Sequence, residues 1–241
     1  MSTFGLIGGQ LKHSFSKQLF EERFVQETHK YLLFELNNLE DLKSIIISNH
    51  LMGFNVTIPF KTTILPYLNE FDETAREIGA VNCVKVQWNK NNFRLKGYNT
   101  DALAFEQSLT MWVQDKIDNA LILGNGGASK AVQYVLLKNG IKFDIVSTQE
   151  KFLVYSNLRQ TMQNYQLIVN TTPLGMYPNI KEYPDIPFDE LNSKHWIYDL
   201  IYNPQETMFL KIAKNQKSHI KNGLKMLSLQ ANFSWKIWNL I

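Results

Sequence analysis

The segment 119–148 constrains the fold most, because a strand, a glycine turn, a helix and a second strand follow one another there without interruption. The apolar strand NALILG runs into GNGGASKAVQYVLLKNG, and KFDIVS follows. Gly140 stands where a glycine commonly ends a helix. Parallel strands must be joined by a crossover of this kind. The segment therefore predicts a βαβ unit with a parallel sheet.

The glycine run Gly124–Ala128 (GNGGA) opens the predicted helix directly after the strand. A backbone that lies against a pyrophosphate needs residues without side chains, and a helix N-terminus adds N–H donors and a favourable dipole. An ordinary tight turn is the alternative reading. The order of strand, turn, helix and strand favours nucleotide binding.

The end of the second strand of such a unit selects between nucleotides. An acidic side chain there favours a free ribose hydroxyl, whereas a cation favours a 2′-phosphate. The chain has Ser147, Thr148 and Gln149 there, followed by adjacent Glu150 and Lys151. The residues alone leave NADP and NAD both open.

The rest of the chain also alternates strand-like and helix-like segments, which predicts an α/β fold, and a length of 241 residues suits one large domain or two modest ones. Before the glycine run we expect a hairpin, VNCVKVQW and FRLKGY, and then a helix over 101–113 capped by Thr100 or Asp101. After it we expect two buried strands (QLIVNTT, HWIYDLIY), a helix with Pro204 in its first turn, and a long apolar C-terminal helix (GLKMLSLQANFSWKIWNLI).

Composition excludes several classes of protein. No run approaches the ~18 apolar residues of a membrane span, and the first residues lack the pattern of a secretion signal. The single cysteine, Cys83, cannot form an internal disulfide, in keeping with a reducing compartment, so we expect a cytoplasmic protein. The net charge of +3 is spread over dispersed lysines, which disfavours a nucleic-acid partner. No Cys/His spacing predicts a metal site.

Four polar clusters follow predicted strands or open predicted helices, where α/β proteins hold ligands. They are HSFS (13–16), NVTIPFK (55–61), AVN (80–82) and GYNTD (97–101). Each has a structural alternative: a serine or aspartate can cap a helix, an asparagine can shape a turn, and Lys61 can be a surface charge. Together they supply hydroxyls, amides, one ammonium and one carboxylate. That set suits a polyhydroxylated carboxylic acid.

Eight blocks in this order resemble the shikimate dehydrogenase family: GLIGGQLKHSFS, NVTIPFK, GAVN, GYNTDA, LGNGGASKA, NTTPLGM, DLIYNPQET and NGLKMLSLQA. The resemblance implies a two-domain α/β enzyme. Residues 1–101 with 222–241 would form the domain that binds dehydroshikimate. Residues 102–221 would form a Rossmann-like domain with a parallel sheet that binds NADP, with NAD as the alternative.

By resemblance, Lys61 and Asp101 are the catalytic residues. The resemblance also assigns substrate contacts to Ser14, Ser16, Thr57, Asn82, Asn99 and Gln230. It assigns cofactor contacts to Gly124, Gly126, Gly127, Ala128, Ser147, Thr148, Thr171, Leu200, Tyr202, Gly223 and Met226. In place of the family's Asn-Arg-Thr clamp for the 2′-phosphate, this chain has Ser147-Thr148-Gln149.

The activity that the resemblance implies is the reversible NADPH-dependent reduction of 3-dehydroshikimate to shikimate, a step of aromatic amino acid biosynthesis. Two alternatives stay open: a quinate/shikimate dehydrogenase that uses NAD, and a non-catalytic protein that binds shikimate or a nucleotide. The presence of both Lys61 and Asp101 favours an enzyme. The expected partner is a small molecule, with neither nucleic acid nor membrane, and the chain is a monomer or a homodimer.

Overall fold

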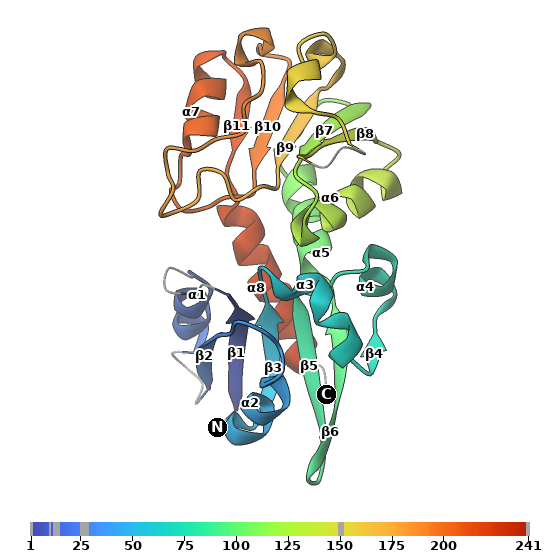
Figure 1. Cartoon of the computed structure of the whole chain (residues 1–241), viewed down its shortest axis with the longest axis vertical. Coiled ribbons are helices and arrows are strands. Elements are labelled where there is room, and N and C mark those ends of the chain that lie inside the picture. The colour runs from blue at the N-terminus through green and yellow to red at the C-terminus, as the bar shows by residue number, and fades with distance from the viewer. Residues whose placement is uncertain (1, 10, 12–14, 25–28, 149–151, 240–241) are drawn as a thin grey trace. The chain divides into compact units, whose positions relative to one another are not determined.

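The computed structural model describes residues 2–9, 11, 15–24, 29–148 and 152–239 (Figure 1). Backbone contacts divide the chain into two compact units, 1–104 with 228–241, and 105–227. The chain crosses from one unit to the other inside α5 (Thr100–Thr110) and again inside α8 (Leu224–Asn239). The first boundary between the units lies three residues later in the sequence than expected, and the second lies six residues later.

The first unit contains a six-stranded mixed sheet in the order β2-β1-β3-β5-β6-β4. The strands β1, β2 and β3 are parallel, β5 runs antiparallel between β3 and β6, and β4 is parallel to β6. One edge of the sheet therefore collects the carboxyl ends of β1, β3 and β6 and the amino end of β5. The bounds are β1 Thr3–Gly8, β2 Lys30–Glu35, β3 Leu51–Val56, β4 Glu70–Phe71, β5 Cys83–Asn89 and β6 Asn92–Tyr98.

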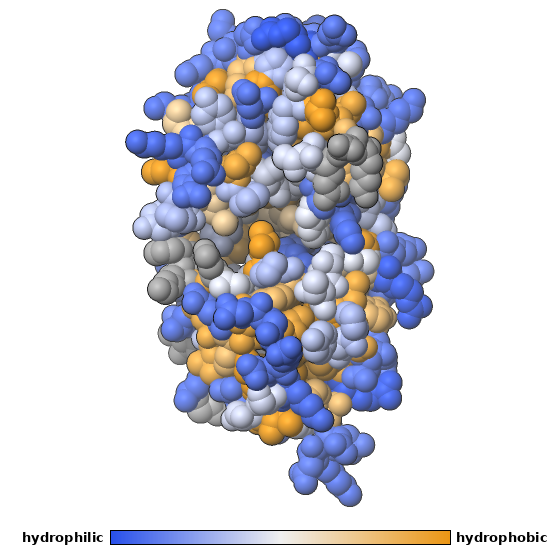
Figure 2. Space-filling view, viewed as in Figure 1, coloured by the Kyte–Doolittle hydropathy of each residue, from blue (hydrophilic) through white to orange (hydrophobic). Residues whose placement is uncertain are grey.

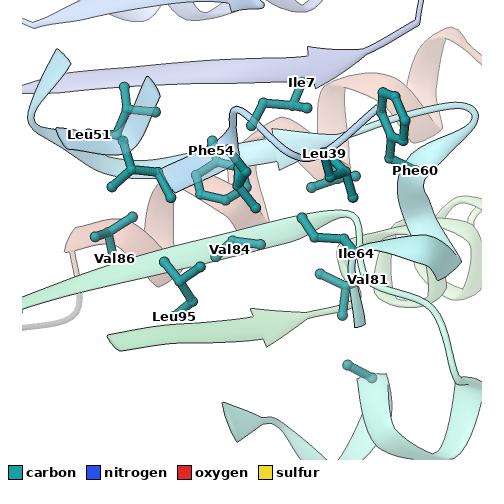
Figure 3. Close-up of a cluster of buried hydrophobic side chains, with 14 residues drawn as sticks. Ile7, Leu39, Leu51, Phe54, Phe60, Ile64, Val81, Val84, Val86 and Leu95 are labelled. Atoms are coloured by element: carbon teal, nitrogen blue, oxygen red, sulfur yellow. The ribbon is translucent and has the colours of Figure 1, made fainter. Parts of the chain in front are cut away.

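Both faces of this sheet are covered, because its strands carry apolar side chains on both sides. On one face Phe54, Val84 and Leu95 pack with α2 (Leu42–Asn49) and α3 (Phe60–Thr63) (Figure 3). The short α4 (Glu73–Ile78) adds Ala75 to that cluster. On the other face lie α1 (Phe15–Phe24) and the unit's part of α8. Aromatic rings dominate that second face: Phe4 stacks on Trp238 with 4.8 Å between ring centroids.

The second unit contains a five-stranded parallel sheet in the order β11-β10-β9-β7-β8. The helix α6 (Gly127–Lys138) joins β7 to β8, and α7 (Met208–Asn215) joins β10 to β11. After β8 the chain returns to the other side of β7 and continues with β9. Ligands of open α/β sheets bind at such a reversal, beyond the carboxyl ends of the strands. The bounds are β7 Asn119–Leu123, β8 Lys142–Val146, β9 Leu167–Asn170, β10 Trp196–Asp199 and β11 His219–Lys221.

The βαβ unit predicted from the sequence is confirmed, and so is the hairpin. Gly140 follows α6 with a left-handed φ of 70°, as a helix-ending glycine requires. The β5–β6 hairpin turns at 89–92, where Lys90 has a φ of 54°. Its tip is hydrophilic (Figure 2).

Two helix starts differ from the prediction. The side chain of Asn99, not that of Thr100 or Asp101, caps α5: its Oδ1 accepts a hydrogen bond of 3.0 Å from the backbone N of Ala102. The helix expected to begin at Pro204 begins instead at Met208, after Thr207, whose hydroxyl accepts from the backbone N of Leu210. In both cases a polar side chain satisfies N–H groups that the first turn leaves open.

Candidate active site

The polar residues of the first unit lie together at the sheet edge described above. Thr57 and Lys61 follow β3, Asn82 precedes β5, and residues 99–101 follow β6. Ser16 lies near the start of α1 and is half-buried. Ser14 is outside the described residues. The mixed directions of β3, β5 and β6 bring together clusters that are far apart in the sequence.

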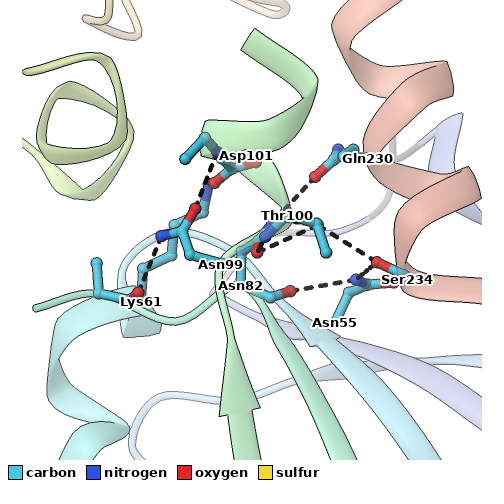
Figure 4. A network of polar contacts seen from close by, with 10 residues as sticks. Asn55, Lys61, Asn82, Asn99, Thr100, Asp101, Gln230 and Ser234 are labelled. Carbon is cyan, nitrogen blue, oxygen red and sulfur yellow. Dashed lines mark hydrogen bonds and ion pairs between the residues drawn. The ribbon is translucent and has the colours of Figure 1, made fainter. Parts of the chain in front are cut away.

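Lys61 and Asp101 form a close ion pair, with 2.6 Å between Nζ and Oδ2 (Figure 4). The two side chains are 14% and 4% exposed. The backbone N of Val81 donates to the carbonyl of Lys61 at 2.8 Å, which fixes the short helix α3 against the start of β5. Asp101 stands in the first turn of α5, where the helix dipole favours a carboxylate. The pair thus places an ammonium donor where it is largely shielded from water.

The side chain of Asn82 connects the start of α5, where Asp101 lies, to α8. Its Oδ1 accepts from the backbone N of Thr100 at 2.7 Å, and its Nδ2 donates to Thr100 Oγ1 at 2.9 Å and to Gln230 Oε1 at 3.1 Å (Figure 4). Asn82 is buried, whereas Gln230 is half-buried. The exposed end of this network is therefore the amide of Gln230.

Asn99 is also buried, and both the nitrogen and the oxygen of its side-chain amide form hydrogen bonds within the chain. Its Nδ2 donates to the carbonyl of Ala80 at 2.9 Å, and its Oδ1 caps α5 through Ala102. Only 1% of the residue is exposed. The structure thus shows Asn99 shaping the turn that presents Asp101, a role that the family resemblance did not suggest.

Three residues support the site in ways that the sequence did not show: Tyr31 and Ser234 were missed, and Asn55 belonged to the NVTIPFK cluster without a role of its own. Tyr31 Oη donates to Asn55 Oδ1 at 2.9 Å, and Asn55 Nδ2 donates to Ser234 Oγ at 2.8 Å and to the carbonyl of Asn82 at 3.1 Å. Asn55 carried a usable signal, because a lone amide in an apolar strand needs a buried partner. Ser234 carried none, since serine occurs in many helices without such a role.

The residues assigned to the cofactor by resemblance lie mostly at the carboxyl edge of the second unit's sheet. They follow β7 (Gly124, Gly126, Gly127, Ala128), β8 (Ser147, Thr148), β9 (Thr171), β10 (Leu200, Tyr202) and β11 (Gly223), and Met226 is in the first turn of α8. Gln149, Glu150 and Lys151 are outside the described residues. Five neighbouring strands thus each deliver part of one candidate surface.

Two glycines of the turn after β7 have different reasons to be glycine. Gly124 has a φ of 100°, and a Cβ there would lie 2.9 Å from Thr171 Oγ1. Gly126 has an ordinary φ of −86°, and a Cβ there would meet no atom of the chain within 4 Å. The chain itself does not require a glycine at 126, but a phosphate group placed against the first turn of α6 would. The residues present therefore fit a bound dinucleotide.

A buried carboxylate ties the loops of this edge together. Asp199, at the end of β10, accepts from Thr207 Oγ1 at 2.6 Å, Asn170 Nδ2 at 3.0 Å and the backbone N of Ile201 at 3.1 Å. Burial raises the pKa of Asp199 to about 6, against the lowering effect of these three hydrogen bonds. The end of β9, the loop after β10 and the start of α7 share this one acceptor.

We expect Asp199 to make the chain more stable at pH 4 than at pH 6. Its pKa is raised from the ordinary 3.8 to about 6 in the folded state, so the folded chain binds more protons than the unfolded chain between these values. The stabilising contribution is present below the unfolded pKa and is lost as the pH rises through 6, by up to about 3 kcal/mol.

Urea unfolding at pH 4, 5, 6 and 7 measures this contribution as the difference in free energy of unfolding between the unmodified chain and Asp199→Asn, which cannot titrate. A difference that stays constant over this range would contradict the assignment.

In the described ranges, no group of three or more His, Cys, Asp or Glu side chains lies close enough together to hold a metal ion. Within the same ranges, the helices are all too short or too polar to cross a membrane.

The fold and the site define a class of two-unit α/β protein. One unit has a Rossmann-like parallel sheet, and the other holds a shielded lysine–aspartate pair. Residues 6–84 match the family described as shikimate dehydrogenase substrate binding domain. A shikimate dehydrogenase (NADP+) of Methanosphaera stadtmanae is 37% identical over 97% of this chain and 90% of its own length. The chain belongs to the shikimate dehydrogenase family.

Solved structures agree with this membership. A shikimate dehydrogenase crystallised in complex with NADP+ is 33% identical, with a TM-score of 0.85, over 100% of this chain and 91% of its own. The enzyme from Thermus thermophilus, in complex with NADP(H) and shikimate, is 26% identical, with a TM-score of 0.85, over 100% of this chain and 94% of its own. The expected α/β architecture is confirmed.

Proposed function

We propose that this chain catalyses the reversible reduction of 3-dehydroshikimate to shikimate with NADP(H). The observation that carries the proposal is the shielded Lys61–Asp101 pair at a sheet edge that also presents hydroxyl and amide groups. The names of the relatives and the ligands of the solved structures support it.

Reduction of a ketone needs a hydride at the carbon and a proton at the oxygen. When bound, NADPH supplies the hydride. The Lys61 ammonium donates the proton to the oxygen as negative charge develops there, which both completes the alcohol and stabilises the charge. Asp101, 2.6 Å from Lys61 Nζ, holds the ammonium in place and compensates its charge within the shielded site. In the reverse direction the same lysine takes up the proton.

The substrate's other groups match the remaining polar side chains of the first unit. We assign the carboxylate to the hydroxyls of Ser14 and Ser16, and the ring hydroxyls to Thr57, Gln230 and Asn82. Binding at Asn82 competes with the hydrogen bond that its Nδ2 makes to Gln230 Oε1. Asn99 we assign to the turn before Asp101, because its amide bonds to the backbone at both ends.

The residues that would hold NADP lie in the second unit. The N–H groups at the start of α6, with Gly124, Gly126, Gly127 and Ala128, suit the pyrophosphate. Ser147 and Thr148 follow β8, where a 2′-phosphate is selected. We assign the nicotinamide to the surface formed by Thr171, Leu200, Tyr202, Gly223 and Met226.

The proposal includes a cytoplasmic location. Cys83 is buried, and burial raises the pKa of its thiol to about 12, so the thiol stays protonated and unreactive. The support for this location is that a single cysteine forms no internal disulfide, as is usual in a reducing compartment.

The test of the proposed function is a nicotinamide absorbance assay of the full chain in four parallel combinations, shikimate or quinate with NADP or NAD. We expect the highest kcat/KM for shikimate with NADP. Faster turnover of quinate with NAD would replace the proposal by the quinate alternative. Absence of turnover in all four, with the chain folded by circular dichroism, would indicate a binding protein.

Replacing Gly126 by alanine should weaken cofactor binding without changing stability. The added Cβ meets no atom of the chain and the backbone φ is ordinary, so the melting temperature should stay within about 2 °C. A methyl group against the pyrophosphate should raise the KM for NADP about tenfold, equivalent to about 1.4 kcal/mol, and leave the KM for shikimate unchanged. An unchanged KM for NADP would exclude the turn from the cofactor site.

A further inference from the structure

The helix α8 carries three polar side chains at four-residue spacing, and each one bonds to the core of the first unit. Gln230 accepts from Asn82, Ser234 accepts from Asn55, and Trp238 Nε1 donates to the carbonyl of Val84 at 3.0 Å. Residues four apart lie on one face of a helix. One stripe of α8 is therefore held to the sheet by directional bonds along three turns.

Trp238 fixes how closely the helix approaches the sheet. A Cβ on Gly53, in the middle of β3, would lie 2.3 Å from Trp238 Nε1. The indole thus occupies the space that any other residue at 53 would fill. Because the indole also stacks on Phe4 at 4.8 Å, the C-terminal half of the helix is anchored mainly by ring packing.

Ser234 makes the middle one of these three hydrogen bonds. The packing of the helix does not require a polar side chain at this position. Its side chain is fully buried, with Oγ 2.8 Å from Asn55 Nδ2 and 3.4 Å from Thr100 Oγ1. Burying a hydroxyl gains nothing over a methyl group unless its hydrogen bonds are made. Apolar contacts from Ala231 and Trp238 already dock the helix. The hydroxyl therefore sets the rotation and register of the helix.

The position of Gln230 follows from this register, since it stands one turn before Ser234. Asn55 also donates to the carbonyl of Asn82, whose side chain meets Gln230 (Figure 4). The far end of the Asn55 amide accepts from Tyr31 on β2, so Asn55 has one orientation only. Ser234 and Asn55 together locate both amides, Asn82 and Gln230, relative to each other.

We propose that Ser234 is a positioning residue for substrate recognition: by bonding to Asn55 it holds α8 in the register that presents the Gln230 amide to the substrate's ring hydroxyls. This inference rests on the proposed function. It predicts that loss of the Ser234 hydroxyl weakens the binding of shikimate and leaves the binding of the nucleotide unchanged.

The experiment compares Ser234→Ala with Ser228→Ala, the same substitution six residues earlier and therefore on a different side of the same helix. For Ser234→Ala we expect the KM for shikimate to rise about fivefold, a loss comparable to that of one hydrogen bond, with the KM for NADP unchanged. Ser228→Ala should leave both KM values unchanged. An unchanged KM for shikimate in Ser234→Ala, or an equal rise in both KM values, would overturn the inference.

A double-mutant cycle with Gln230→Ala separates positioning from general loosening of the helix. If Ser234 acts through Gln230, the double variant Ser234→Ala/Gln230→Ala should have the same KM for shikimate as Gln230→Ala alone. Rises that multiply would show that Ser234 acts independently of Gln230 and would overturn the inference.

Folding is followed by the melting temperature of each variant. If Ser234→Ala does not fold, Ser234→Cys replaces it. Its thiol is larger than the hydroxyl and a weaker donor and acceptor, so the bond to Asn55 weakens and the KM for shikimate should again rise. An unchanged KM in that variant would overturn the inference. Absence of turnover by the unmodified chain would instead overturn the proposed function on which the inference rests.

Discussion

Replacing Lys61 by alanine is expected to lower kcat for shikimate oxidation by about 10²- to 10⁴-fold, the range of a general acid–base group. The variant loses the group that takes the proton from the substrate oxygen, and no other ammonium is bonded to Asp101 in the described part of the chain. The dissociation constant for NADP should stay within a factor of two, since the residues assigned to the cofactor belong to the second unit. Absorbance assays and calorimetric titration with NADP measure the two quantities.

Lys43→Ala, an exposed lysine of the same unit on α2, is the matched control and should retain full activity. Alanine at 61 also leaves the Asp101 carboxylate shielded without its partner, which should cost about 3 kcal/mol of stability or more. Activity is therefore compared at a temperature where both variants are folded by circular dichroism. Turnover at the unmodified rate in folded Lys61→Ala would remove Lys61 from the mechanism.

Replacing Gly223 by alanine is expected to destabilise the fold strongly. A Cβ at this position would lie 2.0 Å from the carbonyl oxygen of Leu200, and its contact is with backbone that cannot rotate away. The backbone N of Gly223 also donates to the carbonyl of Ile201 at 2.9 Å, so the two segments cannot separate without losing that bond. We expect a loss of about 3 kcal/mol or more, which is a fall in melting temperature of about 6–12 °C.

Thermal unfolding followed by circular dichroism measures this fall, and Gly126→Ala is the control because it makes the same change in the same unit where nothing lies within 4 Å. Equal melting temperatures for the two variants would contradict the close approach of Gly223 to Leu200. A fall that is confined to Gly223→Ala would show that this glycine is needed by the fold itself, whatever it contributes to a cofactor.

Local patterns in the sequence were enough to predict the second unit's βαβ motif, because each part of it is encoded by neighbouring residues. Strand 119–123, the glycine turn and the helix ended by Gly140 all follow from residues a few positions apart. The three-residue strand β11 was missed, since it is too short to show an alternating pattern. The start of α7 was misplaced because Thr207 caps the helix where Pro204 was expected to open it.

The candidate site likewise has a part that the sequence predicted and a part that it did not. Polar residues at strand ends marked Lys61, Asn82 and Asp101 as candidates, and the ordered blocks identified the family. The partnership of Lys61 with Asp101 joins residues 40 positions apart, and that of Asn55 with Ser234 joins residues 179 apart. No periodicity or spacing reports pairs like these.

By itself the sequence determined the class of the fold, the family and the candidate site residues, because apolar alternation, glycine turns and short ordered blocks are local properties of a chain. Only the tertiary structure decided which of these residues meet and how they are held: Asn99 caps α5, and the backbone of Gly223 lies close to that of Leu200. It also showed Ser234 as a partner of Asn55. Such roles depend on which segments of the chain lie next to each other in the folded sheet. Because the polar groups of these segments are buried, each of them requires a hydrogen-bond partner.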